Sequence, residues 1–269
     1  MKRINYNNKV AIVTGASSGI GKSIAYRLIK KYGCTVYAIA RNEEKLQKCK
    51  SDLGDLSEKY IVFPMDVSKK DGWESFADLL KSENTSIDLL INCAGVLPEF
   101  KEFEDTNFKE FEKTISINFM SQVYGVYSIL PLILEGGAIV NISSSSALCP
   151  FALVSAYTAS KSAAMHFTTS IAQELKNISV SAVMPGFVKT DIMRQQNVSE
   201  KEAKLIKMVS SDCEKTVSKI LRRVRRRNRR IVVGADAHLM SFLYRFFPRI
   251  APRLISWFLK KTGLELFNK

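Results

Sequence analysis

One turn constrains the fold of this 269-residue sequence more than any other segment. It reads T-G-A-S-S-G-I-G, follows an apolar run over residues 10–14, and opens a segment with helical period. Glycines at such a turn let the backbone approach a pyrophosphate, and the helix N-terminus attracts its charge. An ordinary glycine-rich turn is the alternative interpretation. The predicted dinucleotide contacts here are Gly15, Ser17, Ser18, Gly19, Ile20 and Gly21.

Short apolar runs recur along the chain with helical segments between them. Nearly continuous Val/Ile/Leu runs suit strands that helices cover on both faces. The alternation predicts βαβ units in a single-domain, Rossmann-type α/β fold with a doubly wound parallel sheet. We expect this domain to cover residues 1–234, with residues 235–269 as an apolar and basic C-terminal extension of it. The predicted strands cover residues 10–14, 35–40, 60–65, 87–92, 138–143, 179–184 and 230–233.

Composition limits the classes of ligand that the protein is expected to bind. The formal net charge of +14 favours anionic ligands or acidic membrane surfaces. The five cysteines form no C-x-x-C pair and no zinc-ligand pattern, so we expect free thiols and no metal site. The polar N-terminus has no secretory apolar region, which predicts a cytoplasmic protein.

The end of the second apolar run indicates which dinucleotide binds. An acidic residue there would bind the adenosine ribose and repel a 2′-phosphate, but the sequence has Arg41. Because a guanidinium pairs with phosphate, NADP(H) is the predicted cofactor, although Arg41 as a plain solvated charge is the alternative. The ends of the next two runs supply further predicted contacts, namely Asp66, Val67, Asn92, Ala94 and Gly95.

A tyrosine and a lysine begin another helical segment. Tyr157 and Lys161 are four residues apart and therefore share one helix face. A neighbouring cation lowers the pKa of a phenol, which prepares it for proton transfer. His166 follows on the same segment, and we interpret it as structural.

Six ordered motifs now coincide, and the chain resembles a short-chain dehydrogenase/reductase from Lys9 to about Gly234. The motifs are T-G-A-S-S-G-I-G, N-C-A-G, Ile117-Asn118, N-I-S-S, Y-T-A-S-K and Pro185-Gly186-Phe187-Val188-Lys189-Thr190. The family's usual N-N-A-G is N-C-A-G here, and we interpret Cys93 as a packing change.

The resemblance implies a mechanism. Tyr157 is the general acid in reduction and the base in oxidation, and Lys161 lowers its pKa and holds the nicotinamide ribose. Ser144 binds the carbonyl, although the adjacent serines leave a register shift of one open. Asn118 completes a proton relay through water. The predicted nicotinamide contacts are Tyr157, Lys161, Pro185, Gly186, Val188 and Thr190.

The expected reaction therefore interconverts a ketone or aldehyde and an alcohol. Apolar residues between 187 and 213, namely Met193, Leu205, Ile206, Met208 and Val209, suggest a hydrophobic steroid-, lipid- or aryl-like substrate. The resemblance also implies a homo-oligomer, a dimer or tetramer. The alternative function is a catalytically silent, NADP(H)-binding regulatory protein.

The C-terminal segment is apolar yet punctuated by Arg245, Arg249 and Arg253. A central arginine is costly in a bilayer, so an interfacial membrane contact is more consistent than a spanning helix. The alternatives are a tail packed on its own sheet, over the substrate entrance, or on a second subunit. The arginine-rich run over residues 222–230 has no interleaved aromatic residues, and we expect no nucleic-acid binding.

Overall fold

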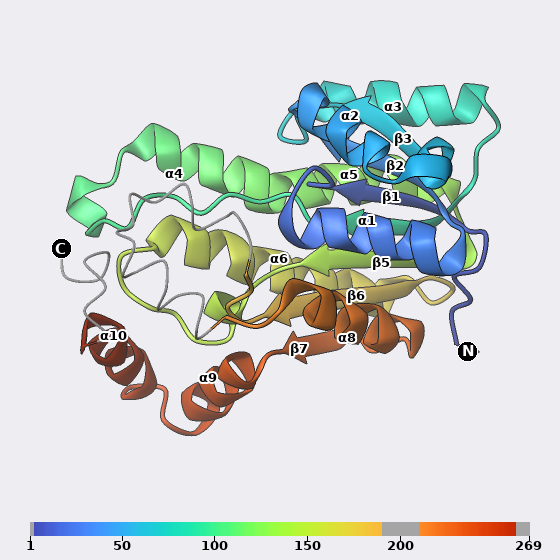
Figure 1. The fold of residues 1–269 in the computed structure, drawn as a ribbon. Coiled ribbons are helices and arrows are strands. Elements are labelled where there is room, and N and C mark those ends of the chain that lie inside the picture. Colours follow the sequence, from blue (N-terminus) through green and yellow to red (C-terminus); the bar gives the residue numbers. More distant parts are fainter. Residues whose placement is uncertain (1–2, 190–209, 262–269) are drawn as a thin grey trace.

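The computed structural model describes residues 3–189 and 210–261. Its sheet has seven parallel strands in the order β3-β2-β1-β4-β5-β6-β7, which confirms the predicted Rossmann-type α/β fold (Figure 1). The strand order reverses between β1 and β4, where α/β sheets of this kind bind their ligands. The strands are β1 (Val10–Thr14), β2 (Thr35–Ala40), β3 (Tyr60–Pro64), β4 (Ile87–Asn92), β5 (Ile133–Ile142), β6 (Ser179–Pro185) and β7 (Arg230–Val233).

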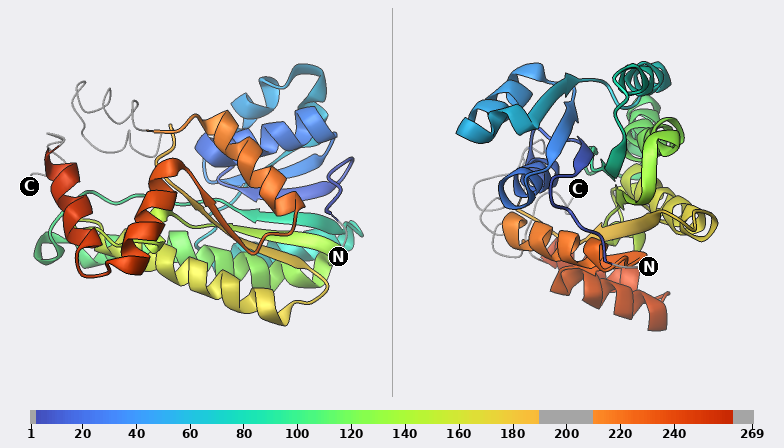
Figure 2. Two further views of the ribbon diagram at one scale, coloured as in Figure 1. Left: turned by 90° about the horizontal axis from the view of Figure 1, so that it is seen from below. Right: turned by 90° about the vertical axis from the view of Figure 1, so that its right-hand side faces the viewer.

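Helices cover both faces of the sheet. Helices α1, α2 and α8 pack on one face, and α3, α5 and α6 pack on the other (Figure 2). The helices are α1 (Gly19–Tyr32), α2 (Glu43–Ser51), α3 (Lys70–Ser82), α4 (Phe108–Ile115), α5 (Ser121–Ile129), α6 (Ser155–Glu174), α8 (Cys213–Arg225), α9 (Ala235–Phe246) and α10 (Ala251–Lys261).

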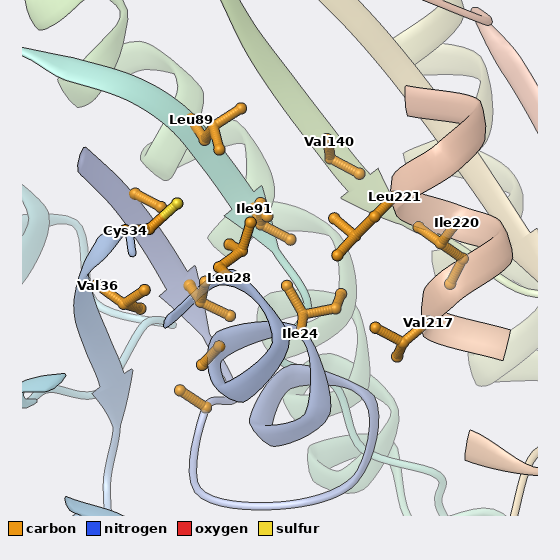
Figure 3. Packing of buried hydrophobic residues seen from close by; sticks show 14 of the residues in the cluster. Ile24, Leu28, Cys34, Val36, Leu89, Ile91, Val140, Val217, Ile220 and Leu221 are labelled. Atoms are coloured by element: carbon orange, nitrogen blue, oxygen red, sulfur yellow. The ribbon is translucent and has the colours of Figure 1, made fainter. Parts of the chain in front are cut away.

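The core lies between the helices and the sheet. On one face, Ile24 and Leu28 of α1 and Val217 and Leu221 of α8 converge on the central strands (Figure 3). These side chains recur every three to four residues, which is the spacing of one helix face. All seven residues of β6 are buried, as expected for a strand covered on both sides.

Helix ends follow their local sequence. The Asn42 side chain caps α2 by accepting a hydrogen bond of 2.7 Å from the Lys45 backbone N–H. Gly33 ends α1 with a φ of 65°, a left-handed conformation that glycine adopts without a steric penalty. Both ends agree with the sequence pattern.

The boundaries of three strands differ from the predicted ones. Strand β3 ends at Pro64, β5 ends at Ile142 and β6 continues to Pro185. Strand β5 begins at Ile133, because Ile133 pairs with Ile87 and the register then shifts before Ala138. The intervening Gly136, with a φ of 82°, interrupts the apolar pattern that the sequence prediction relied on.

The two ends of the described chain pack against the domain. At the N-terminus, the Tyr6 hydroxyl donates a hydrogen bond of 2.9 Å to the Leu221 carbonyl of α8. At the other end, α9 and α10, here called the C-terminal helix pair, follow β7 and lie beside the carboxyl edge of the sheet (Figures 1 and 2). Within the described residues, no helix combines the length and apolarity that a membrane crossing requires.

Candidate active site

A cavity of about 280 Å³ opens at the carboxyl ends of β1, β4, β5 and β6. Side chains that are distant in sequence meet there because parallel strands end at one edge of the sheet. The predicted site residues that line it are Gly15, Ser18, Gly19, Ile20, Gly21, Ala94, Gly95, Ser144, Tyr157, Lys161, Pro185, Gly186 and Val188.

The glycine-rich turn forms the cavity floor at the end of β1. Gly15 has a φ of 67°, and a β-carbon on Gly21 would overlap the Gly15 carbonyl oxygen. Helix α1 therefore starts in direct contact with the turn. The Ser18 side chain makes no capping hydrogen bond, and the first turn of α1 contains no acidic residue. These features fit a pyrophosphate, which would accept hydrogen bonds from the N-terminal amides of α1.

The ends of β1 and β4 are joined through a hydroxyl group. Thr14 Oγ1 accepts hydrogen bonds of 2.9 Å and 3.0 Å from the backbone N–H groups of Cys93 and Ala94. A β-carbon on Gly15 would lie 3.0 Å from the Ala94 Cα atom. The two turns thus approach so closely that only small residues fit, leaving room for a flat ligand.

The Asn92 side chain does not line the cavity but is hydrogen-bonded to a neighbouring strand. Its Nδ2 donates to Asn141 Oδ1 at 2.9 Å, and Asn141 Nδ2 donates to Thr168 Oγ1 at 2.9 Å. This buried chain links β4, β5 and α6 behind the cavity. The Asn92 side chain supports the fold at the point where the sequence predicts a cofactor contact.

One serine of the predicted run is hydrogen-bonded to Tyr157. The Ser144 hydroxyl makes this bond, and it acts to lower the pKa of the phenol. The neighbouring Ser143 Oγ instead donates a hydrogen bond of 2.6 Å to the Lys161 carbonyl. The geometry therefore favours Ser144 over Ser143 as the hydroxyl that faces a substrate.

Tyr157 and Lys161 lie together at the start of α6, as their spacing predicts. The Lys161 ammonium is 5.8 Å from the centre of the Tyr157 ring and donates a hydrogen bond of 3.1 Å to the Ile142 carbonyl. Both groups carry shifted pKa values. Burial raises the pKa of Tyr157, and burial lowers the pKa of Lys161 to about 8.

The direction of the Tyr157 shift differs from the sequence prediction, in which Lys161 lowers the tyrosine pKa. Burial destabilises the phenolate and outweighs the hydrogen bond from Ser144. Burial also destabilises the ammonium of Lys161, which is only 4% exposed. A lysine that loses its proton more readily is a weaker electrostatic partner for the phenol.

Asn118 lies beside the cavity in a π-helical segment, Ser116–Met120, between α4 and α5. Its side chain bonds the Val96 backbone twice, accepting at 2.8 Å and donating at 2.9 Å, and also donates to Ser160 Oγ at 3.1 Å. A β-carbon on Gly95 would lie 3.1 Å from Asn118 Oδ1 and 3.2 Å from Lys161 Nζ. Asn118 and Lys161 thus flank Gly95, and Asn118 fixes the loop that follows β4.

The remaining predicted cofactor residues lie outside the cavity lining. Ser17, Arg41, Asp66 and Val67 are absent from its walls. Burial acts to raise the pKa of Asp66, but hydrogen bonds from Ser68 and the charge of Arg41 lower it overall. Arg41 and Asp66 are therefore electrostatic neighbours at the ends of β2 and β3.

An acidic residue that the sequence reasoning missed holds the turn after β6. Asp236 Oδ2 accepts a hydrogen bond of 2.7 Å from the Phe187 backbone N–H. A β-carbon on Gly186 would overlap the same carboxylate, so the two residues fit closely. Asp236 follows the carboxyl end of β7, and this position is the signal that could have identified it. The predicted contact Thr190 lies outside the described residues.

An apolar wall completes the cavity on the side of the C-terminal helix pair. Its aromatic and aliphatic side chains come from the loops after β4, β5 and β6. They pack in one cluster with Met240 of α9 and Ile255 of α10. The predicted substrate-pocket residues Met193, Leu205, Ile206, Met208 and Val209 lie outside the described residues. The observed wall consists of Leu97, Phe100, Phe151 and Phe187.

Two further observations concern metals and charge. Among the described residues, no group of His, Cys, Asp and Glu side chains could hold a metal ion. Lys45 of α2 also lines the cavity and adds a positive charge near the start of α1. The site therefore offers backbone amides and cations for an anionic ligand, together with an apolar wall.

Comparison with known proteins supports this architecture. A family model described as short chain dehydrogenase matches residues 9–201. The 11-beta-hydroxysteroid dehydrogenase-like 2 protein of Arabidopsis thaliana is 35% identical over 73% of this chain, and the match spans 65% of that relative. The 3-ketodihydrosphingosine reductase of Mus musculus is 29% identical over 86% of this chain and 73% of its own length.

A solved structure has the same fold. The short-chain dehydrogenase/reductase from Burkholderia phymatum, in complex with NAD, superposes with a TM-score of 0.80. The superposition covers 92% of this chain and 96% of that one, at 20% sequence identity. At this identity the likeness establishes the fold alone.

Proposed function

Since the chain belongs to the short-chain dehydrogenase/reductase family, we propose that it interconverts an apolar alcohol and the corresponding ketone or aldehyde with NADP(H). The observation that carries the proposal is the meeting of Ser144, Tyr157 and Lys161 in one cavity with an apolar wall. All three groups are needed for proton transfer to a carbonyl oxygen, and their presence together favours an active enzyme over a silent regulatory protein.

Tyr157 moves the proton in this mechanism. In reduction, its hydroxyl donates a proton to the carbonyl oxygen, and the Ser144 hydroxyl binds the same oxygen. Because burial raises its pKa, Tyr157 holds this proton at neutral pH and is ready to act as the acid. In oxidation, the phenolate accepts the proton of the alcohol. The nicotinamide ring, when bound, carries the hydride.

Lys161 and its neighbours organise the same region. The hydrogen bond from Lys161 Nζ to the Ile142 carbonyl fixes the ammonium beneath Tyr157. From there it can bind a ribose hydroxyl of the cofactor and stabilise the phenolate. Asn118 holds the loop after β4 and so sets the position of Gly95 opposite this ammonium.

The cofactor preference for NADP(H) rests on cations near the ends of β1 and β2. Arg41 follows β2 and is solvent-exposed. Lys45, four residues later, lies in the first turn of α2 and lines the cavity. A 2′-phosphate on the adenosine ribose would attract both side chains. Asp66 stands nearby, but its carboxylate accepts two hydrogen bonds from Ser68.

The substrate is proposed to be a rigid or long-chain apolar molecule, such as a steroid or a sphingoid base. The cavity wall of Leu97, Phe100, Phe151 and Phe187 supports this class. Two relatives carry names that indicate such substrates, a hydroxysteroid dehydrogenase-like protein and a ketodihydrosphingosine reductase. A homo-oligomeric assembly and a cytoplasmic location remain predictions from the sequence.

A substrate panel tests the proposal. The purified protein would be mixed with NADPH or NADH and with steroid ketones, a ketosphingoid base, aryl ketones and sugars, and oxidation of the nicotinamide followed by absorbance. We expect turnover with an apolar ketone and NADPH. Tyr157→Phe is the matched control, and it should retain cofactor binding while turnover falls at least about a thousandfold.

Two outcomes would contradict the proposal. Cofactor binding without turnover of any substrate in the panel would favour the silent regulatory protein. Turnover that survives in Tyr157→Phe would show that another group transfers the proton.

A further inference from the structure

The C-terminal helix pair has two apolar faces, and only one of them is covered. Its inner face consists of Ala237, Met240, Ala251 and Ile255, which are buried. Met240, Ala251 and Ile255 belong to a cluster that also includes Phe100 and half-buried Tyr157. The spacings of three and four residues place them on one side of each helix. The inner face therefore explains how the pair attaches to the domain.

The outer face carries large apolar side chains in solvent. Among the residues whose exposure the structure describes, fourteen large hydrophobic residues are exposed, and eight of them lie between residues 239 and 257. Ile250 is 60% exposed and Trp257 is 56% exposed. Clustering of this kind marks an interaction surface, whereas single exposed residues need no explanation. The outer face consists of Leu239, Phe242, Tyr244, Phe246, Phe247, Ile250, Leu254 and Trp257.

Three arginines are interspersed with these apolar residues. Arg245, Arg249 and Arg253 are exposed, and the guanidinium of Arg245 lies 5.8 Å from the centre of the Phe246 ring. Within residues 3–189 and 210–261, none of the three has a carboxylate within ion-pair distance. The sequence from 237 to 261 contains no Asp or Glu. The surface thus combines apolar side chains with positive charge.

This combination of apolar side chains and positive charge distinguishes between two binding partners of the outer face, a second copy of this chain and a lipid bilayer. In a two-fold contact between copies of this chain, the same face would meet itself, and its arginines would oppose arginines with no acid among residues 237–261 to pair with. A bilayer with acidic lipids supplies both an apolar layer and negative headgroups. The net charge of +14 adds long-range attraction to such a surface.

The geometry therefore points to a new role for the outer face, and we propose that it docks on a membrane containing acidic lipids. The side chains of Phe242, Phe246 and Ile250 enter the acyl boundary, and the arginines bind lipid phosphate and carboxylate groups. The docking is interfacial. Helix α9 ends at Phe246 and α10 begins at Ala251, with Pro248 between them, so neither helix crosses the bilayer.

The position of this surface relates it to the cavity. The inner face of the helix pair packs against the residues that form the apolar cavity wall, including Phe151 and Phe187. The wall and the lipid-facing surface are therefore two sides of one structural unit. An apolar substrate dissolved in the membrane would have a short path to Tyr157. This last point rests on the proposed function, whereas membrane docking does not.

Flotation with vesicles is the primary test and requires no turnover. Full-length protein would be mixed with phosphatidylcholine vesicles, with or without about 30% phosphatidylserine. We expect binding to the acidic vesicles and at least about tenfold weaker binding to the neutral ones or at about 0.5 M salt. Absence of binding to acidic vesicles at low salt would overturn the proposal.

The tryptophans report which part of the protein enters the lipid. The chain contains two, and Trp73 is fully buried while Trp257 is on the outer face. We expect a blue shift of fluorescence on vesicle binding, and quenching by lipids with brominated acyl chains. In Trp257→Phe both signals should disappear while flotation persists. Binding without a change in Trp257 emission would place the contact elsewhere.

Matched variants separate this surface from general basic charge. Arg245→Gln, Arg249→Gln and Arg253→Gln combined should weaken binding on the order of a hundredfold, since each arginine contributes about fivefold. Arg222→Gln, Arg226→Gln and Arg229→Gln remove the same charge from exposed positions near α8. An equal loss in this control would show that net charge, not the outer face, drives binding.

A second pair of variants tests the apolar contribution. Phe242→Ser, Phe246→Ser and Ile250→Ser together should weaken binding at least about tenfold, because their buried apolar area is lost. Leu79→Ser with Tyr127→Ser removes exposed apolar side chains elsewhere and should leave binding unchanged. The lipid-free protein could instead form dimers that bind neither type of vesicle. If the triple serine variant at Phe242, Phe246 and Ile250 dissociates such dimers, the outer face is a protein interface.

Discussion

The carboxylate of Asp236 accepts a hydrogen bond of 2.7 Å from the backbone N–H of Phe187, and this contact joins α9 to the turn after β6. The turn carries Pro185, Gly186 and Val188, which line the cavity. A charged acceptor makes a stronger hydrogen bond than a neutral one. Asp236 therefore positions the cavity wall from outside the cavity.

The first prediction concerns this contact. Asp236→Ala should weaken NADPH binding about tenfold, because a charge-assisted hydrogen bond contributes on the order of 1.5–3 kcal/mol. Asp236→Asn keeps an acceptor and should lose less. Dissociation constants from calorimetry would measure both. An unchanged constant in Asp236→Ala, with a normal melting temperature, would contradict the positioning role.

Gly186 provides an internal check on the same contact. A β-carbon at this position would overlap the Asp236 carboxylate, so Gly186→Ala alone should impair cofactor binding. Combined with Asp236→Ala, the added methyl group has room. The double variant should bind cofactor no worse than Asp236→Ala, which is a non-additive result.

The second prediction concerns cofactor choice. Arg41→Ala should raise the dissociation constant of NADPH at least about tenfold and leave that of NADH within about twofold, because only NADPH carries the 2′-phosphate. Lys48→Ala is the control, because Lys48 is an exposed cation of the neighbouring helix α2 and lies further along the chain from the end of β2. Equal losses for both cofactors in Arg41→Ala would refute the NADP(H) preference.

The third prediction concerns the glycine-rich turn. Gly21→Ala should abolish cofactor binding, because its β-carbon would overlap the Gly15 carbonyl oxygen and displace α1 from the turn. Gly72→Ala in α3 is the matched control, since its β-carbon would lie 3.1 Å from the flexible Met65 side chain and at an ordinary contact distance of 3.9 Å from the Asp66 carbonyl oxygen. Fluorescence titration with NADPH would compare them, and tight binding by Gly21→Ala would contradict the close contact.

The fourth prediction concerns pH and Lys161. Burial lowers the pKa of Lys161 from 10.5 to about 8. Below about pH 8 the folded and unfolded chains both hold this proton, and the cost of burying the charge is fully present. Between about pH 8 and 10.5 the unfolded chain binds the proton that the folded protein has released, so this group makes stability rise with pH.

Lys161→Met isolates this effect because the other titrating groups are common to both proteins. Without cofactor, the variant should be more stable than wild type near neutral pH, by an upper limit of about 3 kcal/mol. The advantage should shrink as pH rises from about 8 to 10.5. Urea denaturation at several pH values would measure it. A stability difference that does not vary with pH would show that Lys161 is not buried in its charged form.

The fold followed from the sequence because its signals are local. Most strands are short apolar runs, and the turns after β1, β4 and β7 contain glycine. The predicted start of β5 was wrong because Ile133 pairs with Ile87 across an irregular register. This pairing is a tertiary contact that no local sequence pattern contains. The π-helical segment around Asn118 was not predicted for a similar reason, because Asn118 is hydrogen-bonded to the backbone of Val96, which is distant in sequence.

The site was predicted unevenly. Motif residues such as Tyr157 and Lys161 occur at a recognisable spacing, and they line the cavity together. Asp236 has no motif, and its role depends on how α9 leaves β7. The direction of the Tyr157 pKa shift also depends on burial, which spacing alone cannot give. Sequence reasoning therefore identified reactive groups better than the surroundings that tune them.

The hydrogen bond between Tyr6 and Leu221 bears on how the protein is made. Its two residues are separated by 215 positions, and Ile4 likewise donates a backbone hydrogen bond to Arg225. At a synthesis rate of about 5–20 residues per second, the N-terminal segment leaves the ribosome roughly ten to forty seconds before its partners. Throughout this interval the first strands have no β7 and no α8 to cover them. The N-terminal segment therefore reaches its native contacts with α8 only after the last third of the chain has been synthesised.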